Sequence, residues 1–176
     1  MGKITLILGG ARSGKSQLAI KTAKEKSKKV AFIATCQALD KEMEKRISLH
    51  KKARPAHWRT FEESRNVSLL LKKIGGKFEV IIIDCLTLLV SNLLLDGFEE
   101  SNIRHEIRKI SLTLKKSKAD AIIVSNEVGL GIVPGNPLGR DFRDIAGKMN
   151  QAIAKESSEV FFMVSGLPVK IKGEEK

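Results

Sequence analysis

Near its N-terminus the chain reads Gly9-Gly10-Ala11-Arg12-Ser13-Gly14-Lys15-Ser16, which matches the pattern G-x-x-x-x-G-K-[ST]. An apolar run at 4–8 precedes this stretch, and a helical pattern at 17–23 follows it. The order of strand, glycine-rich loop and helix predicts a phosphate-binding loop. The alternative is an ordinary glycine turn before a helix, which the preceding strand disfavours.

Each residue type in this loop has a chemical use. Gly9 and Gly14 allow backbone conformations that a side chain would hinder, so that successive N–H groups can point at one anion. The dipole of the following helix favours the same anion. Lys15 would contact the β- and γ-phosphates, and the Ser16 hydroxyl would be a ligand of Mg²⁺. The loop therefore predicts a site for a nucleoside triphosphate with Mg²⁺.

Length and composition indicate a single globular domain, residues 1–176, with 42% hydrophobic residues. No apolar run approaches the ~20 residues that a membrane span needs. The first strand follows Met1 almost directly, so we expect no signal peptide and a cytoplasmic protein. Cys36 and Cys85 lack a metal-like spacing and are expected to be reduced structural thiols.

The formal net charge of +12 indicates a polyanionic partner. The lysines are spread over several predicted helices, the chain has no tyrosine, and aromatic residues do not alternate with basic ones. We therefore expect nucleotides and phosphorylated substrates as the polyanions, and no nucleic acid. A GTP-binding switch would carry an Asn-Lys-x-Asp piece that reads guanine, and this sequence has none.

Apolar runs typical of buried strands alternate with helical patterns along the chain, which favours a mostly parallel sheet covered on both faces. We expect strands at 4–8, 30–34, 58–61, 80–84, 121–124, 160–164 and 169–171. We expect helices at 17–23, 40–51, 67–74, 86–95, 101–116 and 142–155. This order predicts an α/β fold with six or seven strands.

Asp84 ends the apolar strand at 80–84. Ligands of open α/β sheets bind at the carboxyl ends of the strands, so an acid there can hold Mg²⁺ through water beside the phosphate-binding loop. The alternative is that Asp84 caps the helix that begins near Leu86, since Asp is a good N-cap residue. We favour the metal-binding role.

His50 opens a basic segment, 50–62, that contains two histidines and several cations. By composition alone, His50 is more simply a surface residue. The cations would, however, attract a triphosphate, and a neutral imidazole could attack the α-phosphate and expel pyrophosphate. His57 and His105 offer no comparable argument.

The stretch 125–134 reads Ser-Asn-Glu-Val-Gly-Leu-Gly-Ile-Val-Pro and follows a predicted strand. We expect a long loop over 127–139, on the same edge of the sheet as the phosphate-binding loop. A lid or a second-substrate site is one interpretation, because long loops in compact domains are often functional. A purely structural loop is the other.

Several pieces of sequence extend from one end of the chain to the other. They lie at 9–16, 33–35, 46–50, 54–62, 125–134, 142–151 and 164–170. In this order and spacing the chain resembles the bifunctional adenosylcobinamide kinase/adenosylcobinamide-phosphate guanylyltransferases of cobalamin synthesis. The resemblance implies a RecA-like, three-layer P-loop NTPase fold and a homotrimeric enzyme.

The resemblance also implies two reactions at one site. Members of the family phosphorylate the aminopropanol hydroxyl of adenosylcobinamide with a nucleoside triphosphate, ATP or GTP. They then transfer GMP from GTP to adenosylcobinamide phosphate through a guanylylated histidine, which gives adenosylcobinamide-GDP. His50 matches that histidine, and Lys15 is the second expected catalytic residue.

Further roles follow from the same resemblance. Glu62 matches a guanine contact, because a carboxylate can accept hydrogen bonds from N1–H and the 2-amino group, a donor pair that adenine lacks. Ser16 and Asp84 are the expected metal ligands. The full set of expected nucleotide-binding residues is Gly9, Gly10, Ala11, Arg12, Ser13, Gly14, Lys15, Ser16, Ala34, Thr35, Cys36, Lys51, Glu62 and Asp84.

Overall fold

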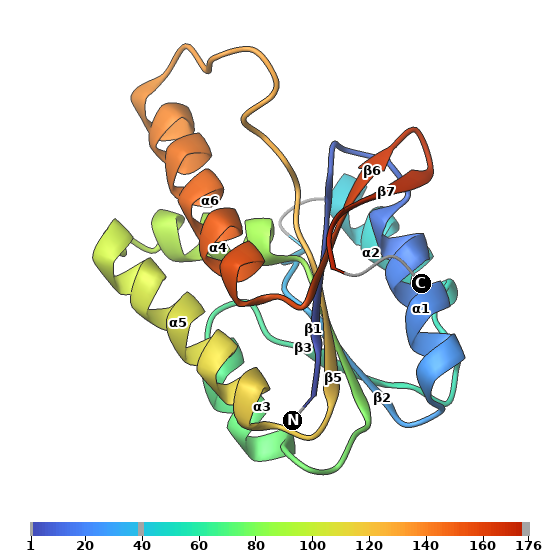
Figure 1. The fold of residues 1–176 in the computed structure, drawn as a ribbon. Coiled ribbons are helices and arrows are strands. Elements are labelled where there is room, and N and C mark those ends of the chain that lie inside the picture. Colours follow the sequence, from blue (N-terminus) through green and yellow to red (C-terminus); the bar gives the residue numbers. More distant parts are fainter. Residues whose placement is uncertain (1, 39–40, 174–176) are drawn as a thin grey trace.

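The computed structural model describes residues 2–38 and 41–173, which form one sheet of seven strands (Figure 1). The strand order is β3-β2-β4-β5-β1-β6-β7. The strands are β1 (Ile4–Gly9), β2 (Val30–Ala34), β3 (Arg59–Glu62), β4 (Val80–Asp84), β5 (Asp120–Val124), β6 (Glu159–Val164) and β7 (Leu167–Lys172). Neighbouring strands from β3 to β6 are parallel, and β7 pairs antiparallel with β6. The predicted, mostly parallel sheet is confirmed.

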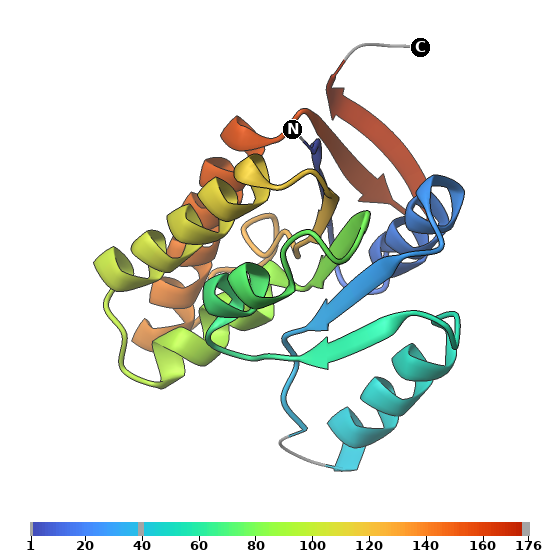
Figure 2. The same ribbon diagram turned by 90° about the horizontal axis from the view of Figure 1, so that it is seen from below.

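Helices cover both faces of this sheet. They are α1 (Lys15–Lys26), α2 (Lys41–Lys52), α3 (Val67–Ile74), α4 (Leu86–Leu95), α5 (Glu100–Lys116) and α6 (Pro137–Glu156). Figure 1 shows α3, α4, α5 and α6 on one side of the strands and α1 with α2 on the other. Seen from below, α2 lies beside the edge strand β3 (Figure 2). The molecule is therefore a three-layer α/β structure.

Buried apolar residues in the central strands supply both cores. Every residue of β1 is buried, and alternate side chains point to opposite faces of the sheet. Leu6 accordingly joins the core beneath α3 to α6, whereas Ile7 joins the core beneath α1. Burying such a side chain stabilises the fold by about 1.5–3 kcal/mol. The continuous apolar runs thus give strands enclosed on both faces, as the sequence predicts.

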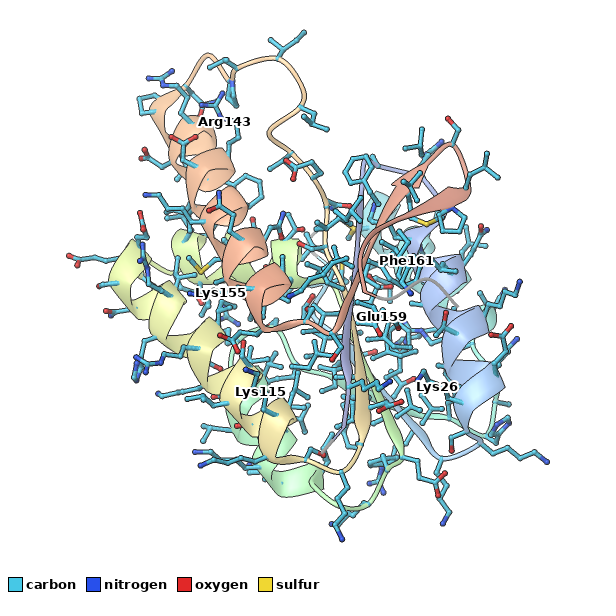
Figure 3. The ribbon with its side chains drawn as sticks, in the orientation of Figure 1. Lys26, Lys115, Arg143, Lys155, Glu159 and Phe161 are labelled. Atoms are coloured by element: carbon cyan, nitrogen blue, oxygen red, sulfur yellow. The ribbon has the colours of Figure 1, made fainter. Side chains whose placement is uncertain are left out.

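The helices of the larger layer differ in how much of their surface is buried. In α5 the buried residues recur at helical spacing, at Ile103, Ile107, Ile110 and Leu114, as predicted. In α4 most residues are buried, because α5 and α6 also contact this helix. An ion pair reinforces the packing at the surface, where Lys115 of α5, labelled in Figure 3, contacts Glu156 at the end of α6.

The predicted boundary between the long loop and the last helix was wrong. The loop was expected to reach Gly139 and the helix to begin at Phe142, but α6 begins at Pro137. Asn136 caps this helix, since its Oδ1 accepts a hydrogen bond from the Gly139 N–H at 2.7 Å. Proline is also favoured in the first helical turn, where its missing N–H has no partner to lose.

Most other boundaries agree with the predictions within one or two residues. The strand expected over 58–61 begins at Arg59, and Trp58 before it is buried at 7% exposure. The helix expected over 40–51 corresponds to α2, although residue 40 lies outside the described residues. No helix within the described ranges is both long enough and apolar enough to cross a membrane.

Candidate active site

The phosphate-binding loop lies between β1 and α1, at the carboxyl edge of the sheet. Gly9 and Gly14 have φ angles of 148° and 94°, which side-chain-bearing residues rarely adopt. A Cβ at Gly9 would lie 2.7 Å from the Met163 carbonyl oxygen and 2.8 Å from Ser13 Oγ. Glycine is therefore required at the start of the loop for space as well as for backbone conformation.

The turn between β6 and β7 packs against this loop. Gly166 N–H donates a hydrogen bond to the Ser13 carbonyl oxygen at 3.1 Å, and a Cβ at Gly14 would lie 3.4 Å from Gly166 Cα. The C-terminal hairpin thus supports the phosphate-binding loop from outside.

Lys15 lies inside the curve of the loop rather than in solvent. Its Nζ donates a hydrogen bond to the Gly10 carbonyl oxygen at 2.5 Å, and the residue is 7% exposed. Burial lowers the pKa of Lys15, while Cys85 and Asp84 oppose the shift. A cation held in this place can move from the carbonyl to phosphate oxygens with little loss of solvation.

Asp84 is the acid around which the candidate site is assembled. Desolvation raises the pKa of its carboxyl group. Four neighbours oppose that shift, namely the Ser16 hydroxyl through a hydrogen bond and then the charges of His50, Arg54 and Lys15. Residues from α1, α2 and the segment after α2 therefore meet at one carboxylate.

The alternative role of Asp84 as a helix cap does not match the structure. The residue at the N-cap of α4 is Cys85, and its side chain makes no capping hydrogen bond. The peptide bond between Asp84 and Cys85 is cis. Burial raises the pKa of Cys85 to about 12, so its thiol is neutral.

The Ser16 hydroxyl and the Asp84 carboxylate form a donor set that fits Mg²⁺. Both supply oxygen, and they are in hydrogen-bond contact. Within the described residues, no group of three His, Cys, Asp or Glu side chains could hold a metal ion. A metal at this place would therefore need phosphate oxygens and water to complete its shell, which is the usual state of Mg²⁺ beside nucleotides.

Thr35, one of the expected nucleotide-binding residues, is placed behind the site. It is 0% exposed, and its hydroxyl donates to the Cys85 carbonyl at 2.7 Å and accepts from the Cys85 N–H at 2.8 Å. These bonds join the ends of β2 and β4, so Thr35 supports Asp84 from the neighbouring strand. Ala34 is buried beside Asp84 in register, and Cys36 is half-buried.

His50 lies in the last turn of α2 and is exposed. His50 is among the neighbours that lower the pKa of the Asp84 carboxyl group. The structure thus brings the predicted nucleophile towards the predicted triphosphate site. Neither His57 nor His105 has such a relation to Asp84.

A pocket of about 380 Å³ adjoins His50 and contains the predicted guanine contact. It is lined by Lys51, Arg54, Pro55, Ala56, Trp58, Thr60 and Glu62. Lys51 and Glu62 form an ion pair across it. We call this space the base pocket, because its volume is of the size usual for small ligands and it holds the two expected nucleotide contacts from 51–62.

Arg54, in the basic segment 50–62, has no role among the expectations from the sequence, yet it lines the base pocket. Its guanidinium lies 3.7 Å from the centroid of the Phe32 ring. Burial lowers the pKa of Arg54, while the charges of Asp84 and Glu62 oppose the shift. Arg54 therefore lines the base pocket and also interacts with the charge of Asp84. Its position directly before Pro55 is the only sequence signal that could have indicated a special role.

The loop after β5 is tied to the phosphate-binding loop at its base. Glu127 N–H donates to the Gly9 carbonyl at 3.0 Å. Ser125 Oγ donates to Asn150 Oδ1 at 2.6 Å, and Asn150 in turn donates to the Asn126 carbonyl at 3.1 Å. Further along, Ile132 is 96% exposed. The loop thus has a fixed base and an exposed apolar tip beside the candidate site.

Comparisons with known proteins give a consistent picture. A family model described as cobinamide kinase / cobinamide phosphate guanyltransferase matches residues 5–171. The bifunctional adenosylcobalamin biosynthesis protein CobP of Pseudomonas aeruginosa is 45% identical over 169 residues, 96% of this chain and 97% of that protein. The corresponding protein CobU of Escherichia coli is 42% identical over 179 residues, 95% of this chain and 98% of that protein.

Among solved structures, the RadB recombinase aligns with a TM-score of 0.52 at 13% identity. The alignment covers 92% of this chain and 74% of the RadB chain. At this identity the likeness concerns the fold alone, and it confirms the predicted three-layer P-loop architecture.

Proposed function

We propose that one site performs two reactions, because this chain belongs to the cobinamide kinase / cobinamide phosphate guanyltransferase family. The chain is accordingly a bifunctional enzyme of adenosylcobalamin biosynthesis, a kinase and a guanylyltransferase. The proposal of a single site is supported by two contacts, since Lys15 lies on the phosphate-binding loop and Arg54 lines the base pocket, and both lower the pKa of Asp84. We infer that a triphosphate on the loop 9–16 and a base in the base pocket belong to one bound nucleotide.

For the kinase reaction, the substrate hydroxyl of adenosylcobinamide attacks the γ-phosphorus of ATP or GTP. The bond from this phosphorus to the bridging oxygen of the β-phosphate breaks, ADP or GDP leaves, and the hydroxyl proton passes to water. The N–H groups of the loop and the Lys15 ammonium hold the phosphate oxygens and stabilise their charge in the transition state. Ser16 and Asp84 would hold Mg²⁺, which supplies further neutralisation of the phosphates when bound. The contribution of the protein is positioning and electrostatic stabilisation rather than covalent chemistry.

For the guanylyl transfer, an imidazole nitrogen of His50 attacks the α-phosphorus of GTP. A P–N bond forms, the bond to the bridging oxygen breaks, and pyrophosphate leaves. An oxygen of adenosylcobinamide phosphate then attacks the same phosphorus and releases the imidazole. Arg54 lines the base pocket and interacts with the charge of Asp84, which supports a role for its guanidinium in stabilising the negative charge at the α-phosphate.

Guanine selection is assigned to Glu62. In the structure Glu62 pairs with Lys51, so binding of guanine replaces or shares this ion pair. The carboxylate would accept from N1–H and the 2-amino group of guanine, and adenine offers no such pair of donors. ATP and GTP then differ in the base pocket but not on the phosphate-binding loop.

The exposed tip of the loop after β5 is proposed as part of a lid or of the corrinoid site. The hydrogen bond from the Glu127 N–H to the Gly9 carbonyl at the base of this loop supports the proposal. We further propose that the chain is one domain and a cytoplasmic homotrimer, as the family resemblance implies. Sedimentation velocity of the purified protein tests the trimer, which a stable monomer would contradict.

The transfer mechanism is tested by mass spectrometry after incubation with GTP. We expect a GMP adduct on His50, none in His50→Ala, and most of the kinase activity retained in that variant. His105→Ala is the matched control and should carry the adduct like the unmodified chain. An adduct on another residue, or undiminished transfer by His50→Ala, would show that the covalent step is misassigned.

A further inference from the structure

A second pocket, of about 520 Å³, lies on the other side of the segment that carries Arg54. Its wall includes Lys24 and Lys28 from the end of α1 and the turn after it, Lys52 from the end of α2, and His57. Trp58 lines both this second pocket and the base pocket, and it closes the second pocket towards the core. We call this space the lysine pocket.

The charge of the lysine pocket is not compensated. Among the side chains that the structure describes, no carboxylate lines it, and none of Lys24, Lys28 and Lys52 forms an ion pair. Neighbouring lysines behave differently. Lys26, at the lower end of α1, pairs with Asp120 at 2.5 Å (Figure 3), and Lys51 pairs with Glu62.

The carboxylate of Glu79 is engaged beside this pocket. Its Oε2 accepts a hydrogen bond from the Ser27 hydroxyl at 2.7 Å, and Oε1 lies 3.6 Å from Lys29 Nζ. Glu79 is thus bound to groups other than the three lysines. Three lysines, one from α1, one from the turn after it and one from α2, thus line one hollow in which no described carboxylate lies.

A shared partition separates the lysine pocket from the base pocket. Arg54, Pro55 and Trp58 line both spaces. Trp58 is 7% exposed, and its Nε1–H has no hydrogen-bond partner among the described residues. Because a buried unpaired donor is unfavourable, a ligand or water that reached this group would be stabilised by it.

We propose that the lysine pocket binds a phosphoanhydride anion, the chemical group shared by pyrophosphate and by the phosphate chain of a nucleoside triphosphate. Lysine is a phosphate ligand that acts as a point charge, and several lysines around one hollow favour a compact anion of multiple charge over a monovalent one. The pocket volume is within the range of small-ligand sites. This site is separate from the loop 9–16 and is not required by either reaction above.

The site is tested by titrating pyrophosphate into the full-length Lys15→Ala variant, in which binding to the loop 9–16 is weakened. Binding is followed by calorimetry and by the fluorescence of Trp58, the one tryptophan of the chain. Ionic strength is held constant, because salt screens exposed charges. We expect saturable binding of one equivalent, weakened at least about tenfold by Lys24→Ala with Lys28→Ala.

The matched control is Lys72→Ala with Lys73→Ala in the Lys15→Ala background. It removes the same charge from the end of α3, on the opposite face of the sheet, and should leave the affinity for pyrophosphate unchanged. Absence of saturable binding, unchanged affinity in the Lys24/Lys28 pair, or an equal loss in the control pair would each overturn the proposal.

The source of the anion is identified by comparing pyrophosphate with GTP and ATP in the same titration. If pyrophosphate, GTP and ATP bind with equal affinity, the pocket recognises the phosphates alone. If the nucleotides bind more tightly than pyrophosphate, the pocket also contacts the base. A single-stranded oligonucleotide that displaces pyrophosphate and binds more tightly would instead make the surface a nucleic-acid site and contradict the proposal. These titrations need no turnover, so they are independent of the GMP adduct on His50.

Discussion

At the scale of single residues, the site is defined by groups whose charges act on one another. Asp84 meets Lys15, Arg54 and His50, which come from separate parts of the chain. Lys15 and Arg54 both have lowered pKa values because burial disfavours their charged forms. A phosphate chain placed between them would replace the lost hydration, which is the physical basis for assigning this place to the nucleotide.

Lys15→Ala is expected to impair both reactions. The side chain is the buried cation of the phosphate-binding loop, and both reactions use the triphosphate held there. Loss of a charged hydrogen-bond donor weakens binding or the transition state by about 1.5–3 kcal/mol, roughly tenfold or more. Separate assays of phosphorylation and GMP transfer measure the effect. Lys21→Ala, on the exposed side of α1, is the control, and an intact kinase rate in Lys15→Ala would contradict one shared site.

Glu62→Gln is expected to separate guanine from adenine nucleotides. The amide keeps the shape of the side chain but loses an acceptor for the second guanine donor, so use of GTP should fall about tenfold. Phosphorylation driven by ATP should change little. The specificity constants kcat/KM for GTP and ATP provide the measurement. An equal decrease for both nucleotides would mean that Glu62 acts on the site in general and does not read the base.

At the scale of helices and strands, the site depends on contacts that fix the ends of elements. Thr35 joins the ends of β2 and β4 behind Asp84, and the β6–β7 turn supports the loop 9–16 through Gly166. At the amino-terminal ends of the strands, the Asp120 carboxylate at the start of β5 accepts hydrogen bonds from Lys26 and from the Lys3 N–H. These contacts keep α1 aligned with the sheet along its whole length.

The contact at Asp120 predicts a pH-dependent contribution to stability. Burial alone raises the pKa of this carboxyl, but its hydrogen bonds with Lys26 and the Lys3 N–H outweigh burial and leave the pKa lowered. A carboxyl group whose pKa is lower in the folded than in the unfolded state stabilises the fold at pH values above its unfolded-state pKa. This stabilisation is lost as the pH falls through the folded-state pKa.

Asp120→Asn should therefore reduce the free energy of unfolding at pH 7, by up to about 1 kcal/mol for a partly exposed pair. The difference from the unmodified chain should shrink as the pH is lowered below about 4. Urea denaturation at a series of pH values measures it. Asp141→Asn, an exposed change of the same chemistry, is the control, and a difference that is constant with pH would contradict the assignment to Asp120 ionisation.

At the scale of the whole molecule, the proposal requires that one nucleotide site serves both reactions in turn. A non-hydrolysable ATP analogue should therefore compete with GTP for formation of the GMP adduct on His50. We expect the GTP concentration needed for half-maximal labelling to rise in proportion to the analogue concentration. Quantitative mass spectrometry of the adduct provides the measurement. Labelling that persists unchanged at saturating analogue would require two separate triphosphate sites.

The sequence predicts local features of this molecule better than those that depend on distant contacts. The phosphate-binding loop was predictable because its residues are contiguous, and the strand over 80–84 because both of its faces are buried. The start of α6 was missed because its cap, Asn136, lies in a stretch rich in glycine and proline. The role of Arg54 was missed because it depends on Phe32, Asp84 and Glu62, which only the folded chain brings together.

The strand order has a consequence for how this enzyme can change over evolution. The loop 9–16 leaves β1, which has β5 and β6 as neighbours, whereas His50 and the base pocket lie on α2, on β3 and on the segment between them, at the rim of the sheet. Substitutions and insertions at a rim disturb fewer packed neighbours than those in the centre. Related proteins can therefore change or lose nucleotidyl transfer while the phosphate-binding loop stays the same.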